Sequence, residues 1–179
     1  MYLPVEVIHQ PGQLYVAVQE ITNSREIAVD TEANSRHRYP EQLCLIQLAT
    51  LNKIFIVDTI LLREIGPLKD MLLDASIMKV FHTAEYDIRS LNRHFGFQLC
   101  GVFDTAIAAQ FIGITQFGLA NLLNDLLGII IGKSARLQKA DWGRRPLSTE
   151  ALVYAANDVR HLLELREFLN VKLRELGRI

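Results

Sequence analysis

Apolar residues recur along the chain in two kinds of run, which predict two kinds of element. Short runs rich in β-branched and aromatic residues predict strands over residues 5–8, 27–32, 43–49, 54–57, 77–81 and 102–103. Apolar residues at helical spacing predict helices over residues 11–22, 61–73, 84–95, 105–112, 119–127 and 149–176. Strands that alternate with helices, followed by a helical C-terminal part, indicate an α/β fold with a mixed β-sheet flanked by α-helices.

The first three strands of this sheet are expected to form an antiparallel meander. Residues 43–49 and 54–57 are joined by residues 50–53, a connection short enough for a hairpin, and residues 27–32 precede them. No linker, internal repeat or low-complexity tract interrupts the pattern. We therefore expect residues 1–179 to form a single domain.

The composition is that of a globular protein whose net charge is close to zero. Hydrophobic residues make up 50% of the 179 residues and charged residues 22%. A chain of this length buries roughly 70% of its unfolded surface. The formal net charge of −1 gives no overall electrostatic attraction to nucleic acid, so binding of that kind must come from local patches.

The sequence also gives an expectation about the cellular compartment. Cys44 and Cys100 lie in apolar contexts that suit buried thiols, which favours a reducing cytoplasm. The first residues lack the basic and then apolar pattern of a secretory signal. No apolar run approaches the roughly 20 residues that a membrane span requires. We therefore expect a cytoplasmic protein without a membrane segment.

Two acids end the predicted strand over residues 27–32, which reads Ile-Ala-Val-Asp-Thr-Glu. Because side chains alternate along a strand, Asp30 and Glu32 project from the same face. Two such carboxylates repel each other unless a positive charge lies between them, and oxygen ligands suit magnesium or manganese better than zinc. An acid that simply closes a strand into a turn is the competing interpretation until other acids join the pair.

A third acid, Asp87, follows the predicted strand over residues 77–81. With Thr83 as the N-cap, Asp87 lies in the first helical turns and is expected to point back toward the sheet. Considered alone, an acid in this position is explained by the helix dipole. Glu85 and His82 likewise have ordinary explanations at the end of a strand.

A fourth acid, Asp158, lies in the last predicted helical segment. Pro146 and either Ser148 or Thr149 mark the start of that segment. Tyr154 and Asp158 are four residues apart and therefore share a face of the helix. A buried tyrosine one turn from an exposed acid would explain an isolated pair of this kind.

Together these segments resemble the three exonuclease motifs of the DEDD superfamily, in the order and approximate spacing of ribonuclease D. The segments are Asp30-Thr31-Glu32, Phe81-His82-Thr83-Ala84-Glu85-Tyr86-Asp87 and Tyr154-Ala155-Ala156-Asn157-Asp158. Residues 39–48 are similar to that family's second strand, and residues 133–147 to its approach to the third motif. Thr83 and Glu85 differ from the residues that relatives commonly show. Ribonuclease D also carries helical RNA-binding domains after the catalytic one, which this sequence does not include.

The resemblance implies an RNase H-like fold and a metal-dependent 3′–5′ exonuclease acting on single-stranded 3′ ends, with RNA favoured. It implies two divalent cations, Mg²⁺ or Mn²⁺, with Asp30 bridging both. Glu32 and Asp158 would complete the first site, and Asp87 would hold the second. Two metals roughly 3.5–4 Å apart generate a nucleophilic water and stabilise the attacking and leaving oxygens.

The tyrosine defines a subclass within this superfamily. Tyr154 lies four residues before Asp158, and Val153 occupies the place of the histidine of the other branch, so the chain resembles the tyrosine (DEDDy) subclass. Because an unperturbed phenol has a pKa near ~10, the role expected for Tyr154 is to orient the attacking water.

Contacts with nucleic acid are expected from a basic segment before the third motif. Five basic residues and one acid occupy residues 133–145, which suits a track for a phosphate backbone: Lys133, Arg136, Lys139, Arg144 and Arg145. A solvated loop explains these charges equally well, although the family also shows a lysine at Lys133. Trp142 is expected to anchor the core rather than to stack on a base. Ala33, in the loop after the first motif, and His82 are further candidates for contact with the terminal nucleotide.

Two alternatives stay open at the level of sequence. A DNA-directed exonuclease of the Werner-helicase type would share every active-site group with an RNA enzyme. A catalytically silent module that binds nucleic acid or protein would retain the fold, although superfamily members that lost activity usually lost an acid, and all four are present here. No pattern in the sequence indicates an oligomeric state.

Overall fold

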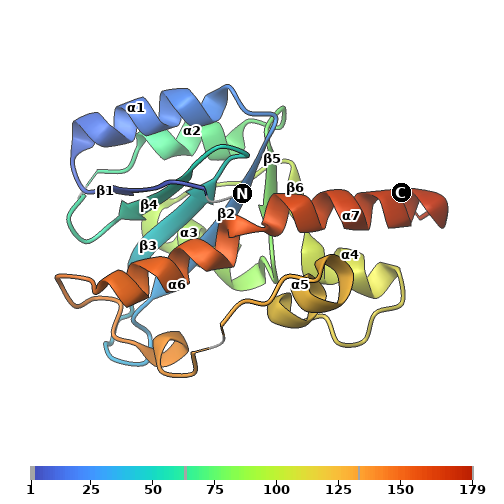
Figure 1. The fold of residues 1–179 in the computed structure, drawn as a ribbon. Coiled ribbons are helices and arrows are strands. Elements are labelled where there is room, and N and C mark those ends of the chain that lie inside the picture. Colours follow the sequence, from blue (N-terminus) through green and yellow to red (C-terminus); the bar gives the residue numbers. More distant parts are fainter. Residues whose placement is uncertain (1–2, 63, 133, 179) are drawn as a thin grey trace.

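The computed structural model describes residues 3–62, 64–132 and 134–178, which contain six strands, seven α-helices and one short 3₁₀ helix (Figure 1). The strands are β1 (Val5–Ile8), β2 (Glu26–Ala33), β3 (Leu43–Ala49), β4 (Ile54–Asp58), β5 (Met78–Phe81) and β6 (Val102–Asp104). The helices are α1 (Pro11–Thr22), α2 (Pro67–Leu73), α3 (Glu85–Phe95), α4 (Thr105–Phe111), α5 (Leu119–Leu127), η1 (Leu137–Lys139), α6 (Thr149–Arg160) and α7 (Leu162–Glu175).

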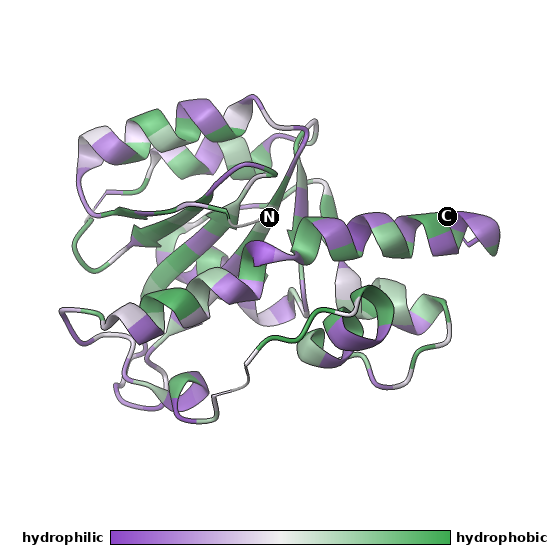
Figure 2. Ribbon diagram, viewed as in Figure 1, coloured by the Kyte–Doolittle hydropathy of each residue, from purple (hydrophilic) through white to green (hydrophobic). Residues whose placement is uncertain are grey.

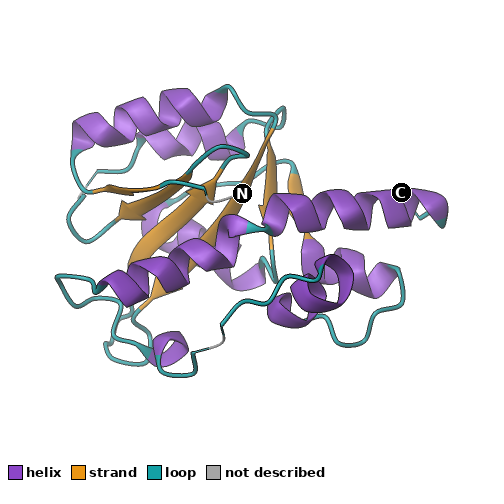
Figure 3. Cartoon of the chain, in the orientation of Figure 1, coloured by secondary structure: helices purple, strands orange, loops and turns teal. Residues whose placement is uncertain are grey.

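The strands form one mixed sheet (Figure 3). Their order in the sheet is β1-β4-β3-β2-β5-β6. Strands β2, β3 and β4 pair antiparallel, which confirms the expected meander. Strand β1 comes first in the chain but lies outside the meander, where it pairs in parallel with β4. Strands β5 and β6 extend the sheet in parallel beyond β2. Strand β2 is therefore a central strand: β5 pairs with its first residues, Glu26–Ala28, and β3 pairs with Ala28–Ala33.

Helices cover both faces of this sheet, so the central strands are buried on both sides. Alternate residues of β2 enter different cores: Ile27 and Val29 pack with α1, α2 and α3, whereas Ala28 packs with α6. Every residue of β3 is buried, as expected for a strand that is covered on both faces. The helices carry stripes of hydrophilic and hydrophobic residues, as amphipathic helices do (Figure 2).

The C-terminal helices build a third apolar cluster beside the sheet. Residues of α4, α5 and α7, among them Ala109, Leu123 and Leu169, pack together there (Figure 1). The expected continuous helix over residues 149–176 is divided in two at His161, where the backbone leaves the helical region (φ −116°, ψ 6°). The break lets α6 lie on the sheet while α7 packs against α4 and α5.

The helix expected over residues 61–73 begins only at Pro67, so its predicted start was wrong. Proline at the first helical position is favoured because its missing N–H would have no helical partner. Before this point, the carboxylate of Asp58 accepts hydrogen bonds from the amides of Ile60 and Leu61 (3.1 Å each). These bonds hold a turn after β4 in place of a helix.

The two cysteines differ in environment. Cys44 is buried in β3 as expected, but Cys100 is exposed, which corrects the expectation of two buried thiols. Leu99 and Gly101 flank Cys100 in a loop before β6, and an apolar neighbourhood in sequence does not ensure burial there. No helix in the described ranges is both long and apolar enough to cross a membrane.

Candidate active site

Strand β2 presents Asp30 and Glu32 on the face of the sheet that α6 covers. Both positions continue the alternation that turns Ala28 toward α6, and both side chains are partly buried. The pairing with β3 shifts register between Glu32 and Ala33. This irregularity ends the regular strand directly after the second acid.

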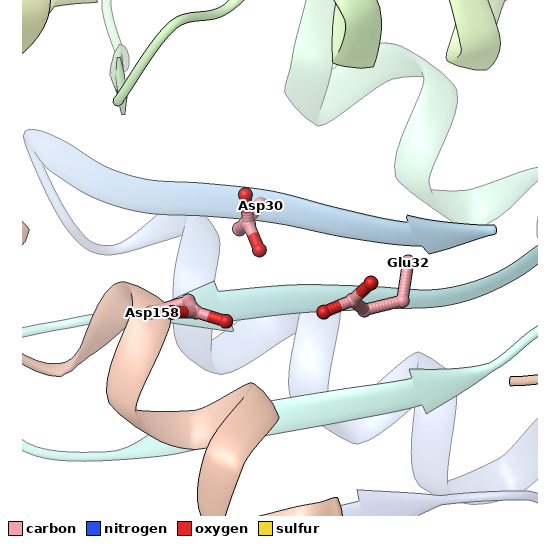
Figure 4. Close-up of side chains that lie close together, drawn as sticks. All are labelled: Asp30, Glu32 and Asp158. Carbon is pink, nitrogen blue, oxygen red and sulfur yellow. The ribbon is translucent and has the colours of Figure 1, made fainter. Parts of the chain in front are cut away.

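Helix α6 brings Asp158 to the same place. The side chain of Ser148 accepts a hydrogen bond from the amide of Ala151 (3.1 Å) and so begins the helix, as one of the two expected caps. One carboxylate oxygen from each of Asp30, Glu32 and Asp158 lies within 4.8 Å of the others. Figure 4 shows the carboxyl groups from the strand and from the helix directed toward one another.

The fourth acid approaches from α3 on the opposite side of β2. Asp87 is 5% exposed, and its carboxylate accepts a hydrogen bond from the hydroxyl of Thr31 (2.5 Å). Thr31 lies between the two acids of β2 and faces the other way, so it fixes Asp87 against the same strand. Asp87 thus points back toward the sheet as expected, although it stands apart from the group of three acids.

Thr83 does not cap α3, which corrects that expectation. The helix begins at Glu85, and Thr83 has a left-handed backbone (φ 65°). The carboxylate of Asp104, from β6, accepts hydrogen bonds from the amides of Thr83 (3.1 Å) and Ala84 (2.8 Å). These bonds to Asp104 fix the backbone that leads into the helix that carries Asp87, and no described side chain caps the first turn of that helix.

Burial raises the pKa values of all four acids, and repulsion among them adds to this effect at Asp30 and Glu32. Burial, and then the charges of Asp87, Asp158 and Glu32, raise the pKa of Asp30 well above its usual range. Burial, and then the charges of Asp158 and Asp87, raise the pKa of Glu32 to about 9. Burial raises the pKa of Asp158 to about 7 and that of Asp87 to about 6, the latter against the effect of the Thr31 hydrogen bond.

Among the described residues, no positively charged side chain forms an ion pair with these acids. Each salt bridge found in that part of the chain lies elsewhere, and none includes Asp30, Glu32, Asp87 or Asp158. Oxygen-only donor sets with several carboxylates are those that Mg²⁺ and similar hard cations prefer. The residues present therefore fit a site for divalent cations.

Three of the acids line a cavity of about 370 Å³. Its wall includes Asp30, Glu32 and Asp158, together with His82 and Tyr154. A larger, mostly apolar hollow of about 590 Å³ lies between β1 and α6, but none of the described residues that line it carries a carboxylate. The smaller cavity is therefore the candidate active site.

Tyr154 lies one helical turn from Asp158 and is half-buried in the wall of this cavity. Burial, and then the charges of Asp158 and Glu32, raise the pKa of its phenol, while a hydrogen bond with Gln138 opposes the shift. The hydroxyl therefore stays protonated at neutral pH. The ring of Trp142 lies 6.1 Å from that of Tyr154 and is buried in the α6 core, as expected for a core anchor.

Comparison with known proteins places this geometry in a family. A family model described as a 3'-5' exonuclease matches residues 5–174, a range that includes the four acids and Tyr154. The chain belongs to the 3′–5′ exonuclease family. The expected resemblance to ribonuclease D and the expected fold class are confirmed by this match and by the relatives below.

Relatives of this chain include an exosome exonuclease and ribonuclease D. The exosome complex exonuclease RRP6 of Saccharomyces cerevisiae is 36% identical over 168 residues, which cover 93% of this chain and 23% of the relative. A structure of Escherichia coli RNase D, an exoribonuclease involved in structured RNA processing, has a TM-score of 0.90 at 30% identity and covers 99% of this chain and 46% of that one. Across eight curated relatives, the chain spans between 19% and 41% of their length.

A metal-bound relative is also known. A structure of Brucella melitensis NrnC with bound Mg²⁺ has a TM-score of 0.79 at 27% identity and covers 99% of this chain and 85% of that one. Divalent metals are used throughout this exonuclease family, and the acidic cluster of the present chain agrees with that use.

The basic residues predicted to contact nucleic acid have different environments in this chain. Lys133 lies outside the described residues. Arg136 pairs with Glu150, whereas the side chains of Lys139 and Arg144 are exposed. The backbone carbonyl of Lys139 lies 2.8 Å from Nε2 of His37, which ties this segment to the loop after β2. Ala33 ends β2 beside that loop and is half-buried.

Arg145 belongs to the fold rather than to a nucleic-acid track, which corrects its predicted role. Its Nε and Nη2 donate to the two carboxylate oxygens of Asp58, at 2.6 and 2.7 Å. Asp58 is 2% exposed, and Nη1 of Arg145 also donates to the carbonyls of Trp142 and Arg144. Nη2 also donates to the carbonyl of Cys44 (3.3 Å), so all five N–H donors of this guanidinium are used within the chain and none is left for a phosphate backbone.

Proposed function

We propose that this chain is a metal-dependent 3′–5′ exoribonuclease that releases nucleotides from single-stranded RNA 3′ ends. The observation that carries the proposal is the group of Asp30, Glu32 and Asp158, which lies at a cavity beside Tyr154. Asp87 is held against the same strand by Thr31, and none of the four acids forms an ion pair with a described residue. The preference for RNA is supported by the names of the relatives, RRP6 and RNase D.

The four acids would hold two divalent cations, Mg²⁺ or Mn²⁺. Asp30, Glu32 and Asp158 form the tight group that suits one ion, and Asp87 supplies the carboxylate on the far side of β2 for the other. Bound ions of this kind lower the pKa of water and stabilise charge on the attacking and leaving oxygens.

The other residues of the cavity position the reactants. Tyr154 carries a protonated hydroxyl, which donates a hydrogen bond and holds the attacking water in line with the phosphorus. Thr31 holds Asp87 in place through its 2.5 Å hydrogen bond. The cavity, at about 370 Å³, has room for about one nucleotide, which suits release of a single residue from a free end.

The test is the release of mononucleotides from 3′-labelled, single-stranded RNA and DNA of the same sequence. Wild-type protein should release nucleotides with Mg²⁺ or Mn²⁺, faster from RNA than from DNA, and should release none with a chelator. Asp158→Asn should lower the rate at least about a thousandfold, because it removes one member of a unit that acts together.

A matched control is Asp70→Asn, an exposed acid on α2 outside the cavity. This variant should degrade RNA at the wild-type rate. Undiminished release by Asp158→Asn, or no release by wild-type protein with either metal, would contradict the exonuclease assignment. Equal or faster degradation of DNA would overturn only the preference for RNA.

A further inference from the structure

His82 occupies the junction between β5 and α3 and lines the same cavity as Asp30 and Glu32. It is half-buried and takes no part in the cation site described above. A histidine in such a cavity offers either a donor or an acceptor to a ligand, depending on its tautomer. The hydrogen bonds around His82 decide between the two.

Those hydrogen bonds fix the proton on Nδ1. Nδ1 of His82 lies 2.9 Å from the hydroxyl oxygen of Thr105, a residue with no exposed surface. That hydroxyl donates its only hydrogen to the backbone carbonyl of Phe81 (3.0 Å), which can only accept. The oxygen of Thr105 must therefore accept from His82, so Nδ1 is the protonated nitrogen.

The other ring nitrogen, Nε2, is consequently an acceptor in the neutral ring. Burial lowers the pKa of His82, against a smaller opposing effect of Asp104, so the ring is neutral at pH 7. Because Nδ1 is turned to the buried Thr105, Nε2 is the nitrogen left to face the cavity. Within the described chain, Nδ1 makes the only hydrogen bond found for this ring.

An acceptor in this place selects among the groups of a nucleotide. Phosphate oxygens carry only lone pairs and would be repelled by a lone pair on Nε2. Donors on the bases differ from one base to the next. The hydroxyl groups of the ribose are donors that every RNA 3′ end presents, and the 2′-hydroxyl distinguishes RNA from DNA.

We infer that Nε2 of His82 accepts a hydrogen bond from a hydroxyl group of the terminal ribose, which makes His82 a residue that binds the 3′-terminal sugar. The inference rests on the proposed exonuclease function and names the part of the substrate that this wall of the cavity recognises. Thr105 acts through His82 as a positioning residue, because it holds the tautomer.

The test compares four single-stranded oligomers that differ only in the 3′-terminal sugar: ribose, 2′-deoxyribose, 3′-deoxyribose and 2′-O-methylribose. Release of the terminal nucleotide is followed under single-turnover conditions. Wild-type protein should act about 3- to 10-fold more slowly on the terminus that lacks the contacted hydroxyl, in line with the loss of one hydrogen bond. The 2′-deoxy and 3′-deoxy arms identify which hydroxyl is contacted.

The matched variant is His82→Asn, because its side-chain amide can still donate to Thr105 but places no acceptor where Nε2 lies. It should slow release from the ribose terminus about 3- to 10-fold and leave the rate on the selectively deoxygenated terminus unchanged. An equal loss on all four termini, or no loss, would overturn the inference. Absence of release by wild-type protein from every terminus would instead contradict the proposed function.

A second measurement needs no activity. Nuclear magnetic resonance of protein with ¹⁵N-labelled histidine should show Nδ1 protonated and Nε2 unprotonated for His82 at pH 7. Addition of adenosine 5′-monophosphate should shift the Nε2 resonance, and the analogue lacking the contacted hydroxyl should not. A proton on Nε2, or equal shifts with the nucleotide and the analogue, would overturn the inference whatever the kinetic result.

Discussion

Two sites in this molecule bury carboxylates, and they treat the negative charge in opposite ways. At the end of β4, Asp58 is 2% exposed and is bound through both oxygens by Arg145. At the end of β2, Asp30 and Glu32 meet Asp158, with Asp87 close by, and none of these acids forms an ion pair with a described residue. The negative charge of Asp58 is neutralised by a residue of the same chain. The negative charge of the acidic cluster requires a cation from solution.

This difference indicates that the paired carboxylate contributes to stability and that the unpaired carboxylates contribute to function. The Asp58–Arg145 pair stabilises the fold, because it joins β4 to the segment that leads into α6. The acidic cluster raises the free energy of the folded state unless a cation binds, since burial and mutual repulsion penalise each charge. Groups that are unfavourable for folding and line a cavity are typical of sites retained for their chemistry.

The largest effect on stability is expected at the compensated site. Asp58→Ala leaves the guanidinium of Arg145 partly buried without its acid, which should lower the free energy of unfolding by about 3–5 kcal/mol in urea denaturation. The double variant Asp58→Leu with Arg145→Met should recover much of this loss, because no unpaired charge remains. A loss below about 1 kcal/mol in the single variant would contradict the structural role of the pair.

An effect of intermediate size is expected for the tyrosine of the uncompensated site. Tyr154→Phe removes the hydroxyl that we propose to position the attacking water, and it should slow nucleotide release about 10- to 100-fold. Binding of Mn²⁺ should be unchanged, because Tyr154 is not a cation ligand. An unchanged rate of release would refute the positioning role, and a loss of Mn²⁺ binding would show that the substitution disturbs the acids.

The smallest effect is expected from pH in the absence of divalent cations. The folded-state pKa values of Asp87, Asp158 and Glu32, about 6, 7 and 9, all lie above the values near ~4 of the unfolded chain. Between about pH 4 and pH 9 the folded state therefore binds more protons, and stability falls as pH rises. With a chelator present, the melting temperature should decrease by several degrees from pH 5 to pH 9.

Two comparisons sharpen the pH experiment. Saturating Mg²⁺ should remove much of the decrease, because a bound cation favours the ionised acids. Asp30→Asn should give a shallower decrease without Mg²⁺, because it removes one of the repelling charges. A melting temperature that rises with pH in the presence of chelator would show that the acids are not destabilising.

Much of the fold followed from local patterns, since the meander and most helices are set by residues close in sequence. The pairing of Asp30 with Glu32 also followed from strand alternation alone. Asp87 and Asp158 did not, because each has an ordinary explanation in its own helix, and only the resemblance to ribonuclease D joined them to the pair. The geometry that gathers them depends on α3 and α6 lying on opposite faces of β2.

Local sequence patterns did not predict the contacts between segments that are distant in the sequence. Arg145 was counted among the nucleic-acid contacts because its partner Asp58 lies 87 residues away. Thr83 was expected to cap α3, but its backbone amide instead donates to Asp104 from β6. The tautomer of His82 likewise depends on Thr105, 23 residues further along the chain. Such contacts leave no periodic trace in the sequence.

Binding of Mn²⁺, followed by electron paramagnetic resonance as the loss of the free-ion spectrum, tests the central claim most directly. Wild-type protein with adenosine 5′-monophosphate should bind two ions per chain, and Asp30→Asn should lose this binding while Asp58→Leu with Arg145→Met retains it. Undiminished Mn²⁺ binding by Asp30→Asn, or no binding by wild-type protein, would contradict the assignment of the acidic cluster as a cation site.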